Sequence, residues 1–368
     1  MTDSNFYYKL TKELLDNLLN NYSDNYDYYR FGPEPKSKFK LKRFFSAQIE
    51  KFGFYRVGKY FDNLKNRLDG NASLITTFEF LYNLLENEPS KDLMMKVLAY
   101  RILDYRKVKL PLNTPEYWQS IKLNEKLCKS TNERIKTVFL NWDLYKVDFE
   151  YIGFPIKIFT PIGNILFNYK VYCLEEPEIK VSENDFVIDA GACWGETALY
   201  FAYLAGPEGK VFSFEFIKEN IEIFDKNLDM NPDLKSRIEL IKHPVFDKSN
   251  IEISFASNGP GSAISKNEDE ESVKEITVSI DDLVKGKIIP KVDFIKMDIE
   301  GSELKALKGA ETTLKTFRPK LAICLYHNID DFRTIPEYIH SLNIGYKFYF
   351  GHFSIHSEES VLFAKADR

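Results

Sequence analysis

One stretch of the chain, residues 185–202 (DFVIDAGACWGETALYFA), constrains the fold more than any other. A short apolar run ends in Asp189, a turn that contains Gly191 and Gly195 follows, and a helix-like pattern comes next. Strand, tight turn and helix in this order are typical of the nucleotide site of an α/β protein. Gly191 lets the backbone turn and approach a ligand closely, because no Cβ stands in the way.

The spacing of this turn, D-x-G-x-x-x-G, differs from the dinucleotide pattern G-x-G-x-x-G. It suits a ligand with a cationic amino-acid head, and Asp189 is expected to accept hydrogen bonds from that ammonium group. A second acid, Glu215, ends the next apolar run, residues 210–215 (KVFSFE). It lies about twenty residues beyond the turn, the distance at which a carboxylate meets a ribose in doubly wound folds.

Three segments, VIDAGACWGETALYFA, KVFSFEF and DFIKMDIEGSELKALKGAE, resemble class I S-adenosylmethionine-dependent methyltransferases of the FkbM type. The similarity runs from about Glu175 to the end of the chain. It implies an α/β fold with the doubly wound, seven-stranded mixed sheet of that class, and S-adenosylmethionine as the methyl donor. The residues then expected to bind this cofactor are Asp189, Gly191, Cys193, Gly195, Glu196, Thr197, Glu215, Phe216, His243, Val245 and Asp298.

Two of these residues carry more specific expectations. Cys193 lies inside the turn and is expected to be a small filler beside the ligand, because methyl transfer to oxygen needs no thiol. His243 follows the predicted third strand, where an adenine would lie. It either stacks on that ring or is an ordinary loop residue.

The candidate catalytic residues also lie where predicted strands end. Asp298 and Glu300 follow the run VDFIKM, and His327 follows the run LAICLY. Since open parallel sheets bind ligands at the carboxyl ends of their strands, these side chains are expected to meet on one rim. Asp298 or His327 would take the proton of an acceptor hydroxyl, and Glu300 would orient either one or hold the acceptor.

Two alternatives stay open at this rim. One is a magnesium ion held by Asp298, Glu300 and a histidine, but no compact ligand motif is visible, so catalysis without a metal is the expectation. The other concerns His352 and His356 in the predicted closing hairpin. They either reach the same rim or are surface loop residues.

Residues 1–150 are expected to be a mostly helical region, because leucines and aromatic residues recur there at helical spacing. This region carries no catalytic pattern, and a dimer interface and an acceptor-binding lobe both remain open for it. Residues 151–368 are expected to form the methyltransferase domain, led by a β-hairpin of residues 156–159 and 165–168. The basic cluster at residues 40–43 is either a solvated helix face or a contact for a phosphate-bearing acceptor.

Composition sets the remaining bounds. The net charge is −5, from 50 basic and 55 acidic residues, which disfavours a nucleic-acid substrate. No apolar run reaches the ~18 residues of a membrane span, and the N-terminus lacks a signal-peptide pattern. The four cysteines are scattered without a C-x-x-C pair, so a zinc site is not expected and the reducing cytoplasm is the expected compartment.

The resemblance implies an O-methyltransferase that acts on a hydroxyl of a sugar or sugar nucleotide, in the synthesis of a surface polysaccharide such as capsule or lipopolysaccharide. The alternative is a non-catalytic methyltransferase-fold scaffold that binds a protein partner through its helical half. The intact glycine turn and Glu215 favour the enzyme. An NAD(P)-dependent oxidoreductase is disfavoured, because the chain has no G-x-G-x-x-G at the turn.

Overall fold

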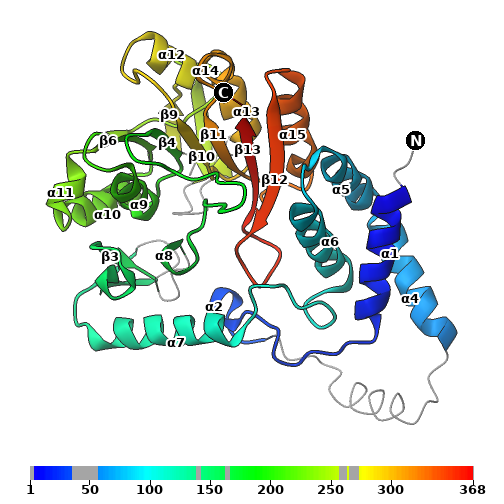
Figure 1. Cartoon of the computed structure of the whole chain (residues 1–368). Helices are drawn as coiled ribbons and strands as arrows, with labels where there is room; N and C mark the ends of the chain where they lie inside the picture. The colour runs from blue at the N-terminus through cyan, green and yellow to red at the C-terminus, as the bar shows by residue number, and fades with distance from the viewer. Residues whose placement is uncertain are drawn as a thin grey trace.

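A computed structural model describes residues 4–34, 57–137, 142–161, 166–256, 263–264 and 273–367. At its centre is a seven-stranded sheet in the order β12-β13-β11-β10-β4-β5-β6 (Figure 1). The strands are β4 (Phe186–Ala190), β5 (Lys210–Phe214), β6 (Ile238–Ile241), β10 (Phe294–Met297), β11 (Lys320–Cys324), β12 (Tyr346–His352) and β13 (Ser360–Ala366). The first five are parallel, whereas β13 runs antiparallel to β11 and β12 antiparallel to β13. The predicted doubly wound mixed sheet is confirmed.

Helices cover both faces of this sheet, so its inner strands are apolar on both sides. Successive side chains point to opposite faces. Val187 and Phe294 pack in one core, whereas Ile188 and Ile295 pack in the other. The helices that follow the strands are α9 (Glu196–Ala205), α10 (Lys218–Asp229), α11 (Pro232–Lys235), α12 (Ile280–Lys285), α13 (Glu303–Lys308), α14 (Glu311–Phe317) and α15 (Asp331–Ser341).

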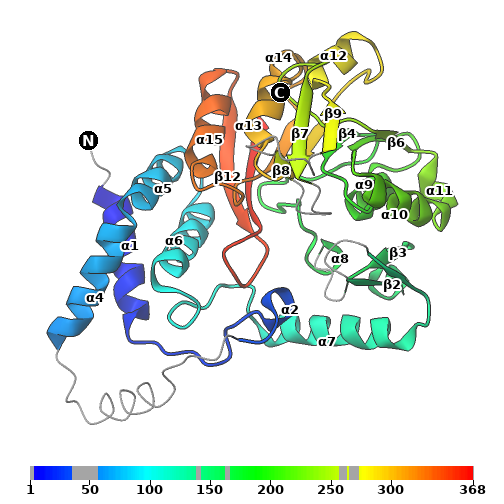
Figure 2. The same ribbon diagram turned by 180° about the vertical axis from the view of Figure 1, so that it is seen from behind.

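The N-terminal part of the chain is helical, as expected, and it packs against the sheet. Its helices are α1 (Ser4–Leu18), α2 (Tyr28–Phe31), α4 (Val57–Gly70), α5 (Ala72–Leu84), α6 (Glu88–Leu103) and α7 (Pro115–Ser130). Figures 1 and 2 show α5 and α6 beside β12 and α15. The backbone N–H of Phe350 donates to Ser90 Oγ (3.0 Å), and Phe78 stacks on Phe332 with 4.4 Å between ring centroids. A division of the chain at residue 150 therefore stays a prediction, since these helices share a core with the sheet.

A small antiparallel sheet contains β1 (Arg134–Lys136), β2 (Asp143–Asp148) and β3 (Lys157–Thr160). Of these strands, β3 coincides with the first strand of the predicted leading hairpin, whereas β1 and β2 lie in the region expected to be mostly helical. After β2 comes a 3₁₀ turn, η1 (Phe149–Ile152), and residues 166–169 form a short helix, α8 (Leu166–Tyr169), so the hairpin prediction is wrong. The free edge of β3 is bound by side chains of α10 and the turn after it. The N–H groups of Lys157 and Phe159 donate to Asn231 (2.9 Å) and Asn227 (2.7 Å), which leaves no edge for a second strand.

An excursion between β6 and β10 carries β7 (Glu252–Ala256), β8 (Ala263–Ile264) and β9 (Val273–Ile276), with β7 and β9 paired antiparallel. Strand β9 ends at Ile276 and does not continue to Ser279. Ser279 instead caps α12, because its hydroxyl accepts from the N–H of Asp282 (3.2 Å). The basic cluster at residues 40–43 lies outside the described residues.

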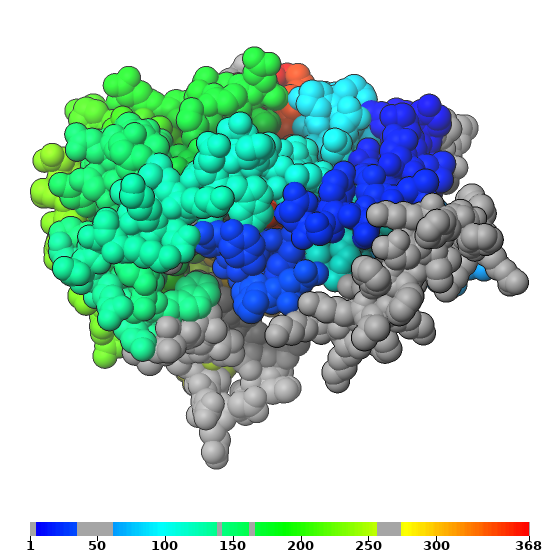
Figure 3. All heavy atoms as spheres, turned by 90° about the horizontal axis from the view of Figure 1, so that it is seen from below, coloured from blue at the N-terminus to red at the C-terminus, as the bar shows by residue number. Residues whose placement is uncertain are grey.

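The rim at the carboxyl ends of the parallel strands faces α2 and α7. The loop between β12 and β13 reaches toward these helices (Figure 1). Figure 3 shows α7 and the segment around α2 next to each other on the face seen from below. None of the helices among the described residues combines the length and apolarity needed to cross a bilayer.

Candidate active site at the carboxyl ends of the strands

A first cleft lies at the carboxyl ends of β4, β5, β6 and β10, with an empty volume of about 650 Å³. The predicted cofactor residues that line it are Gly191, Cys193, Glu215, Phe216, His243, Val245 and Asp298. Glu300 lines it as well. The structure thus brings together seven predicted residues from segments that are distant in sequence, while Asp189, Gly195, Glu196 and Thr197 lie elsewhere.

The excursion supplies a wall of the first cleft that sequence reasoning missed. Phe255 of β7 stacks on Phe216 with ring centroids 4.2 Å apart, and Ile253 lines the cleft beside it. The alternating pattern of residues 251–255 predicts a strand, but nothing local in it places that strand over the end of β5.

The glycine turn is shaped for close approach to a ligand. Gly191 has a φ of +82°, and a Cβ built there would overlap the backbone oxygen of Asp298. Gly195 has a φ of +89°, and a Cβ there would lie 2.9 Å from the ring of Phe224 on α10. Only glycine fits either position without strain. Gly191 therefore forms the floor of the cleft, and Gly195 lets α9 begin close to α10.

Glu215 is buried where β5 ends and presents its carboxylate to the first cleft. Its Oε1 accepts from the N–H groups of Phe216 and Ile217, both at 2.8 Å, and its Oε2 from Asn220 Nδ2 at 3.3 Å. Burial raises the pKa of Glu215 to about 7, although these donors oppose the shift. The three donors fix the orientation of the carboxylate. Its oxygens can each accept a further hydrogen bond, for example from a ligand hydroxyl.

Asp189 lies behind the cleft wall, a placement that differs from the expected contact with a ligand ammonium. Its side chain is 0% exposed and accepts from Thr197 Oγ1 at 2.9 Å and Ser213 Oγ at 3.2 Å. Its charge is balanced by Lys296 Nζ, 3.2 Å away. Lys296 is a lysine inside an apolar strand, which is the sequence signal for such a buried pair, and sequence reasoning missed it.

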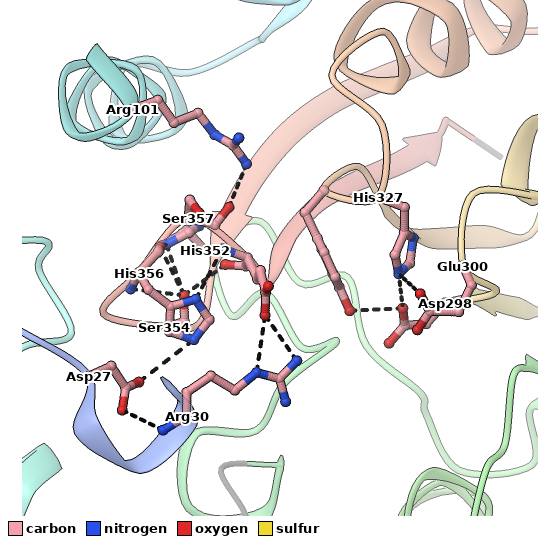
Figure 4. Close-up of polar contacts among 12 residues, drawn as sticks. Asp27, Arg30, Arg101, Asp298, Glu300, His327, His352, Ser354, His356 and Ser357 are labelled. Carbon is pink, nitrogen blue, oxygen red and sulfur yellow. Dashed lines mark hydrogen bonds and ion pairs between the residues drawn. The ribbon is translucent and has the colours of Figure 1, made fainter. Parts of the chain in front are cut away.

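Asp298, Glu300 and His327 meet at the rim as expected (Figure 4). His327 Nε2 lies 3.3 Å from Asp298 Oδ1 and 3.6 Å from Glu300 Oε2. Asp298 also accepts from Tyr172 Oη at 2.7 Å and Tyr326 Oη at 2.9 Å. His327 lines neither cleft, so the carboxylates stand between it and any ligand.

A third acid, Glu303, approaches the other ring nitrogen of His327. Its Oε1 lies 2.9 Å from His327 Nδ1 and accepts from the N–H of Ile299 at 2.8 Å. Burial lowers the pKa of His327, but Glu303, Asp298 and Glu300 outweigh it and raise that pKa to about 10. Burial likewise raises the pKa of Glu300 to about 7.

A second cleft, with an empty volume of about 1700 Å³, also opens on Asp298. Its walls come from α2, α7, β2, the start of α9 and the loop before β13. Aromatic side chains line it, namely Tyr29, Tyr117, Trp142, Tyr145 and Tyr172. Carboxylates line it as well, namely Asp27, Asp143, Glu196, Asp298 and Glu359. The N-terminal helices thus complete the rim.

Besides Asp298, three residues named in the sequence analysis line this second cleft, and a fourth, His352, does not. Thr197 lines it, and so does Glu196, whose pKa burial raises to about 7. His356 lines it beside Asp27, with 3.7 Å between Nε2 and Oδ2. His352 is buried, with Nδ1 2.9 Å from Ser360 Oγ, and burial lowers its pKa to about 3. His352 contacts Ser360 and the backbone oxygen of His356 at the loop between β12 and β13, and it does not reach the rim.

The first cleft fits S-adenosylmethionine by its own chemistry. The glycine floor leaves room that a Cβ would fill, the Glu215 carboxylate suits ribose hydroxyls, and the rings of Phe216 and Phe255 form an apolar wall. This combination of one apolar side and a few fixed polar groups is typical of a small-molecule site. The cleft also lies outside the carboxyl ends of parallel strands, where open α/β sheets bind nucleotides.

Known proteins resemble this chain in sequence and in fold. Residues 189–348 match the family described as Methyltransferase FkbM domain. The hexuronic acid methyltransferase AglP of Haloferax volcanii is 32% identical over 148 residues, or 39% of this chain and 55% of AglP. The chain thus spans about half the length of this curated relative.

A solved structure of a methyltransferase FkbM from Methylobacillus flagellatus superposes over 92% of this chain and 72% of its own, with a TM-score of 0.52 and 19% identity. This likeness concerns the fold alone. Together with the strand order, the match over residues 189–348 indicates a methyltransferase FkbM domain in this part of the chain.

Proposed function

We propose that the protein is an O-methyltransferase that moves a methyl group from S-adenosylmethionine to a hydroxyl of a sugar or sugar nucleotide. The observation that carries this proposal is that Asp298 lines both clefts. A donor in the first cleft and an acceptor in the second would therefore meet at a carboxylate. The name of the relative AglP, a hexuronic acid methyltransferase, supports a carbohydrate acceptor.

The first cleft would hold the donor through groups already fixed in place. Glu215 would accept hydrogen bonds from the ribose hydroxyls, and Gly191 would allow the backbone to approach the amino-acid part. Phe216, Phe255 and His243 would enclose the adenine. S-adenosylmethionine supplies a methyl group that its sulfonium already activates, so the protein has to align the reactants and manage one proton.

Asp298 is the group best placed to manage that proton. Its two oxygens are oriented by Tyr172 and Tyr326, and it faces the acceptor side. It would accept a hydrogen bond from the acceptor hydroxyl and draw off its proton as the new bond forms. His327 would act through Asp298, because it lines neither cleft, whereas Glu300, which lines the first cleft, would orient His327 from that side.

The second cleft suits a carbohydrate by its composition. Aromatic faces such as Trp142 and Tyr145 can stack on a sugar ring, and carboxylates can accept hydrogen bonds from its hydroxyls. Asp27 and Tyr117 on α2 and α7 bring the N-terminal region into this cleft, which favours an acceptor-binding role for that region. We place the reaction in the cytoplasmic synthesis of a surface polysaccharide, on the strength of the family resemblance.

Two measurements test the proposal. Isothermal titration with S-adenosylhomocysteine should give a 1:1 complex, and Glu215→Ala should weaken it, whereas the exposed variant Lys347→Ala should not. Mass spectrometry of a panel of neutral, amino and acidic nucleotide sugars, incubated with enzyme and donor, should reveal one product heavier by a CH₂ group. No binding of S-adenosylhomocysteine at millimolar concentration would instead favour a non-catalytic scaffold.

A further inference from the structure

The cluster at the rim contains buried polar atoms that lack hydrogen-bond partners. Both ring nitrogens of His327 and Oε2 of Glu303 are buried, and none of the described residues forms a hydrogen bond with them. The side chains are 8% and 1% exposed. Burying a polar atom without a hydrogen-bond partner costs free energy, unless another group such as a proton, a water molecule or an ion interacts with it.

The spacing around His327 Nε2 is that of ligand atoms around an ion. Nε2 lies 3.3 Å from Asp298 Oδ1 and 3.6 Å from Glu300 Oε2, both longer than an ordinary hydrogen bond. Two atoms that each lie about 2.1 Å from one metal ion are separated by about 3.0 to 3.4 Å, depending on the bond angle. Both distances from Nε2 are therefore close to the spacing between two ligand atoms of a shared ion, and Asp298 and His327 also belong to a group of side chains that could hold a metal ion.

The surroundings of these three residues match those of a metal site. Glu303 Oε1 lies 2.9 Å from His327 Nδ1, on the far side of the ring from Asp298, so a small rotation would complete a carboxylate–histidine–metal arrangement. Hydroxyl groups of Tyr172 and Tyr326 orient the Asp298 carboxylate. Oriented ligands of this kind are a general feature of protein metal sites.

The backbone between Asp298 and Glu303 is bent to bring the acids to the histidine. Glu300 has a φ of +54° and Gly301 a φ of +89°, both in the left-handed region. A Cβ at Gly301 would lie 2.6 Å from Asn328 Nδ2, because this turn packs directly on the residue after His327. A non-glycine residue in this conformation is strained, so the surrounding packing has to hold Glu300 in place.

We propose that Asp298, Glu300 and His327 Nε2 bind a divalent metal ion, with Glu303 as the residue that positions His327. One imidazole and two carboxylates suit a first-row ion such as Mn²⁺. Both carboxylates line the first cleft and Asp298 also lines the second, so the ion would lie where the two clefts meet. Its open positions would hold an acceptor hydroxyl oxygen. Asp298 and Glu300 lie in the turn after β10, whereas His327 lies in the loop after β11, which explains why the sequence shows no compact motif.

The other possible occupant is a proton, which would make His327 an imidazolium among three carboxylates. Metal binding separates the two cases. Chelator-treated protein titrated with Mn²⁺, followed by calorimetry and by loss of the free Mn²⁺ electron paramagnetic resonance signal, should bind one ion per chain. His327→Ala should abolish that binding, and Glu303→Gln should weaken it 10- to 100-fold. His340→Ala, an exposed histidine on α15, should bind as the unaltered protein does.

The folding of each variant is checked by circular dichroism, and Glu300→Gln provides a second ligand variant if His327→Ala does not fold. Binding of S-adenosylhomocysteine by the same chelated sample tests the donor site of the proposed function separately, since that measurement requires no metal ion. The metal proposal is overturned if the unaltered protein binds Mn²⁺, Co²⁺ and Zn²⁺ no better than His327→Ala, or if His340→Ala loses the ion instead.

Discussion

Lys296 and Asp189 form an ion pair that is closed to solvent, with 3.2 Å between Nζ and Oδ1 and exposed fractions of 1% and 0%. The two residues are direct neighbours across the parallel pair β10 and β4. Nζ also donates to the backbone oxygens of Ala190 (3.1 Å) and Gly191 (2.7 Å). The pair therefore ties the glycine turn to the strand that carries Asp298.

Lys296→Met should destabilise the protein and weaken donor binding together. Removing one partner of a buried pair leaves an uncompensated charge, at a cost of about 3–5 kcal/mol, and the carbonyl of Gly191 loses its donor. Urea unfolding and titration with S-adenosylhomocysteine measure the two effects. The double variant Lys296→Met/Asp189→Asn should recover part of the stability, because both charges are then gone. Lys347→Met breaks an exposed pair instead and should change stability by less than about 1 kcal/mol. Unchanged stability in Lys296→Met would contradict this account.

Gly191→Ala should reduce the affinity for S-adenosylhomocysteine by at least about tenfold. The added methyl group would overlap the backbone oxygen of Asp298, and the residue would be held at a φ of +82°. Gly345→Ala is a matched control, because Gly345 has a φ of +83° with open space around it. Its backbone strain is comparable, but it lies far from the cleft. Equal losses of affinity in the two variants would show that strain alone explains the effect.

Donor binding should strengthen as pH rises from 6 to 8. Burial raises the pKa of Glu215 to about 7, so the carboxylate is mostly protonated at pH 6 and mostly ionised at pH 8. Ribose hydroxyls donate to the ionised form, which predicts about a tenfold gain in affinity over this range. For the free protein the sign is opposite: the folded state holds this proton more tightly than the unfolded chain, so stability falls as pH rises through 7.

Glu215→Gln assigns this pH dependence to its source. Glu300 lines the same cleft, and burial raises its pKa to about 7 as well, so it is the other acid that could titrate there. Calorimetric affinities across the pH range should become flat in Glu215→Gln. A pH dependence that persists in this variant would show that Glu215 is not its source and would point to Glu300.

The parts of the structure that sequence predicts are those with local signals. Periodicity and turn residues locate the strands. Gly191 directly follows β4 and Glu215 directly follows β5, and ligands of open α/β sheets bind at these strand ends, so both residues indicate the first cleft. The second cleft has no such signal: Asp27, Tyr117, Trp142 and Glu359 come from four separate segments that only the packing of α2 and α7 brings together. Tertiary contacts also explain the burial of Asp189 and the failure of the predicted hairpin.

Asp189 lies near the carboxyl end of β4, which is why the sequence predicts a ligand contact there. The strand register places Lys296 opposite Asp189, and the two side chains form a buried ion pair. The predicted hairpin failed for a similar reason. Its apolar residues fit a strand, yet side chains of Asn227 and Asn231 take the backbone groups with which a partner strand would pair. The local sequence around Asp189 does not reveal Lys296 as its partner, and the local sequence around β3 does not reveal the two asparagines.

Phe78→Ala should destabilise the whole domain by about 3–5 kcal/mol, because the ring is fully buried and stacks on Phe332 of α15. Denaturant unfolding followed by circular dichroism should still show a single transition, since α5 shares its core with the sheet. Leu19→Ala, at a side chain 76% exposed, should stay within about 0.5 kcal/mol of the unaltered protein. Two separate transitions in Phe78→Ala would instead favour the helical region as an independent unit.

Tyr172→Phe and Tyr326→Phe should each lower turnover while leaving donor affinity within about twofold. Each hydroxyl donates to a different oxygen of Asp298, at 2.7 Å and 2.9 Å, so each variant loosens one side of the carboxylate that faces the acceptor. A hydrogen bond to a charged group contributes about 1.5–3 kcal/mol, which corresponds to roughly a tenfold or greater loss of rate. Single-turnover rates with the acceptor found in the sugar panel, together with titration by S-adenosylhomocysteine, measure the two properties. Tyr203→Phe removes a hydroxyl that donates to Gly153 O at 3.4 Å, far from Asp298, and should leave both unchanged. If Tyr172→Phe weakens donor binding and spares the rate, Asp298 serves the donor side alone.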